Sequence, residues 1–131
     1  MTRRFLAALS LAALAPAAGA QQVAGGDHAE ARTLYEMHCA YCHGADATGG
    51  GPLAPALILQ PPDLTALSER NDGVFPVERV VMRIDGREPL VSHGSPMPVY
   101  GGFFDEGGRD TAIRAETGQP ILAAEEVVQL T

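Results

Sequence analysis

The 131-residue sequence contains no lysine and no tryptophan, and its nine positively charged residues are all arginine. These arginines stand against 16 acidic residues, which gives a formal net charge of −7. Nucleic acid is therefore not an expected partner, because a protein that binds phosphates needs a basic surface. Only two cysteines are present, and they are too few for a scaffold held together by disulfides.

A long alternation of apolar and polar residues is also missing, which argues against a mainly β fold. The chain has instead 15 Gly and 10 Pro with 19% charged residues, a composition that predicts many turns. We expect one all-α domain of about four short helices with long loops. Because loops longer than about 12–15 residues are uncommon in compact domains, these loops indicate that a non-protein group fills the middle.

The first 20 residues have the layout of a secretory signal peptide. Arg3 and Arg4 precede an apolar run from Phe5 to Ala15, and small residues follow as far as Ala20. That run is far shorter than the roughly 20 residues of a membrane-spanning helix, so we expect cleavage and no membrane span in the mature chain. Residues 21–131 would keep seven arginines against 16 acids, a net charge of −9, in a domain exported to the periplasm.

Apolar residues three and four positions apart predict two clear helices. The first runs from residue 28 to about residue 43 and ends at Gly44, and the second follows Pro76 and ends at Gly86. We also expect a short helical turn over residues 64–69. The chain after Pro120 is predicted to return to helix, beginning near Ala123.

The sequence Cys39-Ala40-Tyr41-Cys42-His43 has the C-x-x-C-H pattern of covalent haem attachment. Cys39 and Cys42 are three residues apart, so both thiols leave one face of a helix and can each add to a vinyl group of one porphyrin. His43 shares that face, and a histidine is a common ligand of haem iron. The motif predicts one covalently bound haem c.

Three other sites remain possible for this motif. A redox dithiol would need a βαβ context, and none is visible. A zinc site would need four ligands, but only His28, His38 and His93 remain as loose donors. A simple disulfide is possible in an oxidising compartment. The position of the motif after an export signal, in a chain rich in loops, favours haem.

The motif is preceded by Ala31–Tyr35 and followed by Gly49–Leu57 and His93–Gly101. With these segments the chain resembles a bacterial class I monohaem cytochrome c over roughly residues 29–128. It implies a small cytochrome c fold that wraps one haem, with His and Met as axial iron ligands. It also implies that the carbonyl of Pro52 accepts the second ring N–H of His43. Tyr100 is assigned either a hydrogen bond to a haem propionate or the role of a packed loop aromatic.

Met97 is our prediction for the second axial ligand. Met37 and His38 share a helix with His43, Met82 lies off the apolar stripe of its helix, and His28 is near the start of the fold. Met97 stands between two prolines in the last long loop and matches the Met-Pro position of the family that the chain resembles. His93 is the alternative ligand, and Met97 could instead fill a gap in the core.

Filled axial positions leave electron transfer through an exposed haem edge as the expected function. The protein would be an electron carrier rather than an enzyme, either free or as the cytochrome subunit of a dehydrogenase. A labile Met97 ligand would instead allow gas binding or peroxide reduction, and a haem-free secreted domain is a third possibility. Since the chain is acidic and lacks lysine, redox partner proteins are expected to dock through a basic or apolar patch.

The last predicted helix has about eight residues before Thr131, and isolated helices of this length are marginal. In the family that the chain resembles, this helix crosses the first one at positions that correspond to Ala31 and Tyr35. No capping glycine or polar tail closes it. We therefore expect the natural chain to continue for about two more turns, or roughly 7–10 residues.

Overall fold

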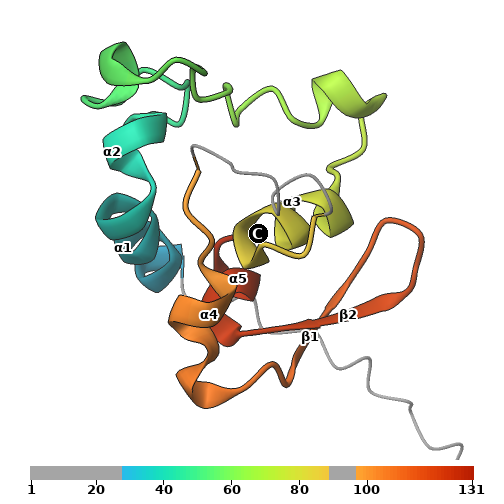
Figure 1. Ribbon diagram of the computed structural model, residues 1–131. Coiled ribbons are helices and arrows are strands. Elements are labelled where there is room, and N and C mark those ends of the chain that lie inside the picture. The colour runs from blue at the N-terminus through green and yellow to red at the C-terminus, as the bar shows by residue number, and fades with distance from the viewer. Residues whose placement is uncertain (1–27, 89–96) are drawn as a thin grey trace, which may run out of the picture.

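The computed structural model describes residues 28–88 and 97–131. Two short helices follow one another along one side of the molecule, a third lies across from them, and residues 44–76 bridge the two sides (Figure 1). The expected class is confirmed, since the fold is mostly short helices and loops. In chain order the helical elements are α1 (His28–His38), α2 (Ala40–His43), η1 (Ala54–Ala56), η2 (Glu69–Asn71), α3 (Val77–Asp85), α4 (Gly101–Phe104), η4 (Asp105–Gly107) and α5 (Glu125–Gln129).

The first predicted helix is present as α1 and α2, with a break at Cys39. The break arises because the amide of Cys42 donates to the carbonyl of Cys39 at 3.1 Å, three residues back instead of four. The second predicted helix is α3, which ends at Gly86 in the left-handed conformation, with φ of 85°. Glycine adopts this conformation without strain and commonly ends helices.

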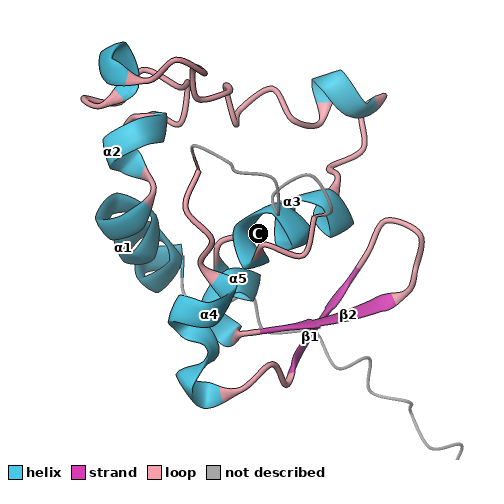
Figure 2. Ribbon diagram, viewed as in Figure 1, coloured by secondary structure: helices cyan, strands magenta, loops and turns pink. Residues whose placement is uncertain are grey.

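A small β-hairpin was not predicted. Strands β1 (Thr111–Arg114) and β2 (Pro120–Ala123) pair antiparallel, with Ile113 opposite Ile121, and they extend to one side of the helices (Figure 2). The segment expected to enter the last helix is therefore strand β2, and α5 begins only at Glu125. Residues of β2 alternate between exposed and buried, but four residues are too few to show a period of two in the sequence.

The hydrophobic core lies between α3, α4, the hairpin and α5. It does not extend into α1, of which no residue is fully buried; Leu34 only packs against the core from outside. Helix α5 contacts both α1 and α3. The buried members of the core are Val81, Ile84, Phe104, Ala115, Ile121, Ala123, Ala124 and Val127.

Polar contacts attach the hairpin region to both ends of α3. A carboxylate oxygen of Glu116, in the hairpin turn, accepts a hydrogen bond from the amide of Glu78 at 3.0 Å, and this bond lowers the pKa of Glu116. At the other end of α3, Asp85 is buried and forms ion pairs with Arg87 and Arg109. Within the described residues, no helix is both long and apolar enough to cross a bilayer.

Candidate functional site

The five-residue motif occupies the break between α1 and α2 and the whole of α2. Cys39 and Cys42 are free thiols and partly buried, while His43 is buried with 8% of its surface exposed. The predicted helical arrangement thus brings the two sulfurs and the imidazole to one helix end, except that the local turn at Cys39 is tighter than in an α-helix.

A glycine-rich loop folds back on the end of α2. Its amides donate to the last three carbonyls of that helix, which have no helical donor of their own. The bonds are Gly49 N to His43 O at 2.8 Å, Gly51 N to Cys42 O at 3.1 Å and Leu53 N to Tyr41 O at 3.0 Å. A methyl group at Gly51 would stand 2.5 Å from the carbonyl oxygens of Tyr41 and Cys42. The loop thus requires glycine here and fixes the helix end that carries His43.

The ring of His43 is oriented by Pro62, at 3.3 Å between Nδ1 and the carbonyl oxygen. The prediction that the carbonyl of Pro52 accepts this hydrogen bond was wrong. Pro52 lies exposed in the returning loop, whereas Gly49 packs so closely on the carbonyl of Pro61 that a side chain there would collide with it. This contact brings the 61–62 segment to the imidazole. Because a carbonyl only accepts, the bond places a hydrogen on Nδ1 and leaves the lone pair of Nε2 for a metal.

The environment of the thiols argues against a redox dithiol. Burial, and next the nearby Cys42, raise the pKa of Cys39 to about 11. Dithiol oxidoreductases need a thiolate, which a helix N-terminus or a cationic neighbour stabilises. Cys39 lies at the break between α1 and α2, where burial and not a cationic neighbour dominates its pKa. A neutral thioether suits this environment better than a thiolate.

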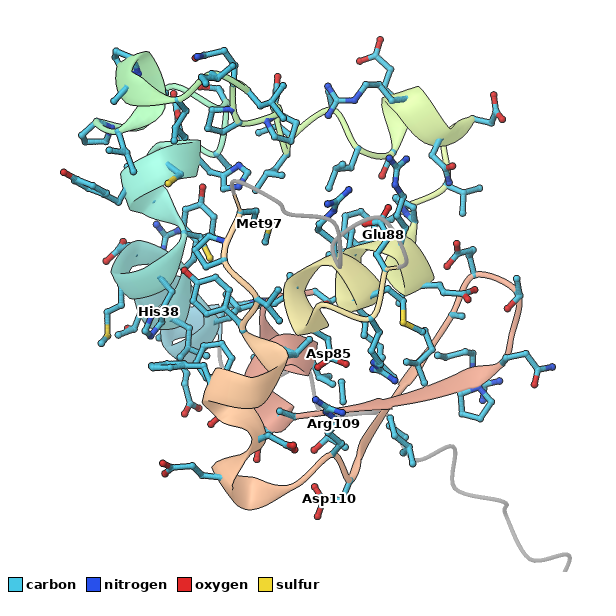
Figure 3. All side chains as sticks on the ribbon, in the orientation of Figure 1. His38, Asp85, Glu88, Met97, Arg109 and Asp110 are labelled. Carbon is cyan, nitrogen blue, oxygen red and sulfur yellow. The ribbon has the colours of Figure 1, made fainter. Side chains whose placement is uncertain are left out.

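Met97 and Tyr100 belong to a loop that approaches the motif from the other side of the molecule. Met97 is partly buried and packs against the core, and Figure 3 draws it between α2 and α3. The hydroxyl of Tyr100 donates to the carbonyl of His38 at 2.7 Å, and its ring stacks on Phe104 with centroids 5.7 Å apart. Since the hydroxyl hydrogen is used within the protein, the geometry favours the packed aromatic over the propionate donor.

The other candidate iron ligands lie elsewhere or outside the described residues. The ring of His38 is surrounded by Phe103 and Phe104, with centroids at 5.4 and 5.3 Å. Met82 lines a groove between α3 and the hairpin. His93 lies outside the described residues, as do residues 1–27 with the predicted signal peptide. Across residues 28–88 and 97–131, no group of three or more His, Cys, Asp or Glu side chains could hold a metal, so the zinc alternative has no ligand set there.

The residues present fit a covalently bound haem. Two free thiols and an oriented, buried imidazole on one helix end are the donors that covalent attachment and iron ligation require. Large apolar side chains near these elements in sequence are exposed, among them Leu59 at 64% and Val99 at 49%. Exposed apolar surface of this kind is what an apolar macrocycle can cover.

Sequence reasoning missed two features of the site. The role of Pro62 had a weak signal, the Pro61-Pro62 pair, which was interpreted only as a loop. The bond between Tyr100 and His38 had none, because it joins residues 62 positions apart through a backbone carbonyl that carries no residue identity.

A family model for cytochrome c matches residues 28–101, more than half of the chain. The match begins at the first residue of α1 and ends just after Tyr100, so it contains the motif, the glycine-rich loop, α3 and Met97. The hairpin and α5 lie beyond it. No curated protein matches the chain significantly, and no solved structure does.

Proposed function

Because the chain belongs to the cytochrome c family, an electron-transfer family with a c-type haem, we propose that it carries single electrons on one haem bound through Cys39 and Cys42. His43 and Met97 would be the axial ligands. A haem supplies a one-electron iron couple, and the protein determines its ligands and surroundings. The observation that carries this proposal is the oriented imidazole of His43 beside two partly buried thiols.

Each residue of the site has a defined task in this proposal. Cys39 and Cys42 hold the group covalently, and His43 presents Nε2 because Pro62 engages Nδ1. Met97 supplies a neutral sulfur from the opposite loop. A thioether raises the reduction potential relative to harder donors, and exclusion of water by apolar side chains acts in the same direction.

Substitution of the proposed sulfur ligand tests this function. In Met97→Ala we expect the reduction potential to fall and the ferrous protein to bind carbon monoxide, because the sixth position opens. Met82→Leu is the matched control, since Met82 lines the groove beside the hairpin, and should keep the wild-type spectrum. An unchanged spectrum and potential in Met97→Ala would transfer the assignment to His93 or Met82.

Carbon monoxide binding by the reduced wild-type protein distinguishes electron transfer from the alternative function. A protein whose Met97 ligand is labile would bind carbon monoxide readily and act in gas binding or peroxide reduction. We propose that the wild type binds carbon monoxide poorly when reduced, as expected for an iron with two protein ligands.

We propose that the protein acts in the periplasm. The N-terminal 20 residues favour secretion to the periplasm, where the protein would act as a free carrier or as the cytochrome subunit of a dehydrogenase.

Its acidic, lysine-free composition favours a partner with a basic or apolar docking patch. With a basic partner, electron transfer should slow as ionic strength rises; acceleration by salt would contradict this surface assignment.

A further inference from the structure

Tyr100 occupies a junction between the motif and the loop of Met97. Its hydroxyl contacts the last residue of α1 through the carbonyl of His38 at 2.7 Å. Its amide donates to the carbonyl of Ile84 in α3 at 2.9 Å. One residue thus joins the end of α1 directly before Cys39, the loop that carries Met97 and helix α3 across the molecule.

The carbonyl of His38 is available because of the break at the motif. In an unbroken α-helix it would accept from the amide of Cys42, four residues later. That amide donates to Cys39 instead, at 3.1 Å. A partly buried carbonyl without its helical donor is costly, and the hydroxyl of Tyr100 supplies the missing bond.

The residues beside Tyr100 allow close packing of the loop on α3. A side chain at Gly101 would collide with Asp85, and one at Gly86 would collide with Val99. The chain from Tyr100 back to Met97 covers three residues, which span at most about 10 Å. Whatever fixes Tyr100 therefore restricts where Met97 can lie.

We infer that Tyr100 is the positioning residue that holds Met97 in reach of the iron, through the hydrogen bond from its hydroxyl to the carbonyl of His38. The bond connects the side that carries His43 directly to the side that carries Met97, so it favours the arrangement in which both can be ligands. This inference rests on the proposed function, since it assumes that Met97 is a ligand.

Tyr100→Phe tests the inference, because it removes only the hydroxyl and keeps the stacked ring. The covalent haem should remain, while the fraction of protein with Met97 dissociated should rise. We expect the apparent affinity of the ferrous protein for carbon monoxide to increase about fivefold, which corresponds to about 1 kcal/mol, the net contribution of one hydrogen bond. The weak red absorption band of the methionine-ligated ferric protein should persist, because the form with Met97 bound still predominates.

Tyr35→Phe is the matched control. The hydroxyl of Tyr35 also donates to a backbone carbonyl, that of Gly44, at 2.7 Å, but this bond lies within the N-terminal segment and does not involve the Met97 loop. We expect Tyr35→Phe to lower the free energy of unfolding about as much as Tyr100→Phe does. It should leave the carbon monoxide affinity at the wild-type value.

The outcomes separate the inference from the function beneath it. If Tyr100→Phe loses stability like Tyr35→Phe with no change in carbon monoxide affinity, Tyr100 is only a packing residue and the inference is overturned. If the wild-type protein lacks the methionine band, or Met97→Ala leaves it unchanged, the ligand assignment itself has failed.

Discussion

Two regions of the described chain are stabilised in different ways. The attachment segment, residues 28–64, is held by backbone hydrogen bonds from a glycine-rich loop to the end of α2. The core segment, residues 77–88 and 97–131, contains the cluster of buried apolar side chains. Among the described residues, Ala54 is the single buried hydrophobic residue of the attachment segment.

This difference indicates what each region needs in order to fold. Apolar burial is the main favourable term in folding, and the attachment segment has little of it within the protein. We therefore expect its stability to depend on the group that the thiols bind. The core segment has its own apolar interior and depends less on that group.

The largest effect should come from removing an attachment point. In Cys42→Ser we expect the yield of haem-loaded protein to fall drastically, because only the Cys39 thioether can form and the segment has no core to compensate. The measurement is the mass of the protein after acid–acetone extraction, which removes haem that is not covalently bound. Tyr41→Phe, at an exposed neighbouring side chain, should keep one haem per chain. A haem-loaded Cys42→Ser protein of normal yield would contradict this account.

A methyl group in the returning loop should have the next largest effect. Gly51→Ala places a carbon 2.5 Å from two backbone carbonyl oxygens, and backbone cannot move aside as a side chain can. We expect a loss of about 3 kcal/mol in the free energy of unfolding, measured by denaturant titration of the haem-loaded protein. Gly102→Ala, with no atom near its new carbon, should be neutral or slightly stabilising. Equal effects at both positions would show that the loop does not depend on this contact.

In the core segment, Val127→Ala should cost about 2 kcal/mol, because it removes two methyl groups from a fully buried site and leaves a cavity. Val74→Ala, at a half-exposed side chain, is the control and should change the free energy of unfolding little. We also expect amide exchange in Val127→Ala to increase mainly in α3, the hairpin and α5, which belong to the core segment. Loss of protection first in α1 and α2 would reverse our assignment of the two regions.

The smallest expected effect is a pH dependence of stability through Glu116. The pKa of Glu116 is lowered chiefly by the hydrogen bond from the amide of Glu78, so the bond stabilises the fold above the ordinary pKa of glutamate, about 4.3. That contribution is lost as pH falls through the lowered pKa of the folded state. Glu116→Gln should therefore have a slightly lower melting temperature than wild type at pH 7, and the gap should close toward pH 3. Glu106→Gln, on the exposed surface, is the control; a gap that persists in acid would exclude this cause.

The sequence predicted local features of both regions well. The stripe of valines with its glycine stop located α3, and the spacing of the motif placed two thiols and His43 at one helix end. The hairpin was missed because each strand has only four residues, and β-pairing depends on a partner chain segment rather than on local pattern. Pro62 was missed for a similar reason. Which of several prolines reaches an imidazole depends on how the loop closes, and that closure is determined by the contact at Gly49.

The separation of bonded residues along the chain indicates an order of assembly. The bond from Leu53 to Tyr41 closes a loop of twelve residues, whereas the bond from Tyr100 to His38 closes one of 62. The longer closure costs about 1.5 kcal/mol more chain entropy. We therefore expect the thiol-bearing turn to form while later residues are still unfolded, which pulse-labelled amide exchange during refolding can detect. A chain that is synthesised and exported N-terminus first would then present its two sulfurs for modification before the segment that contains Met97 has folded.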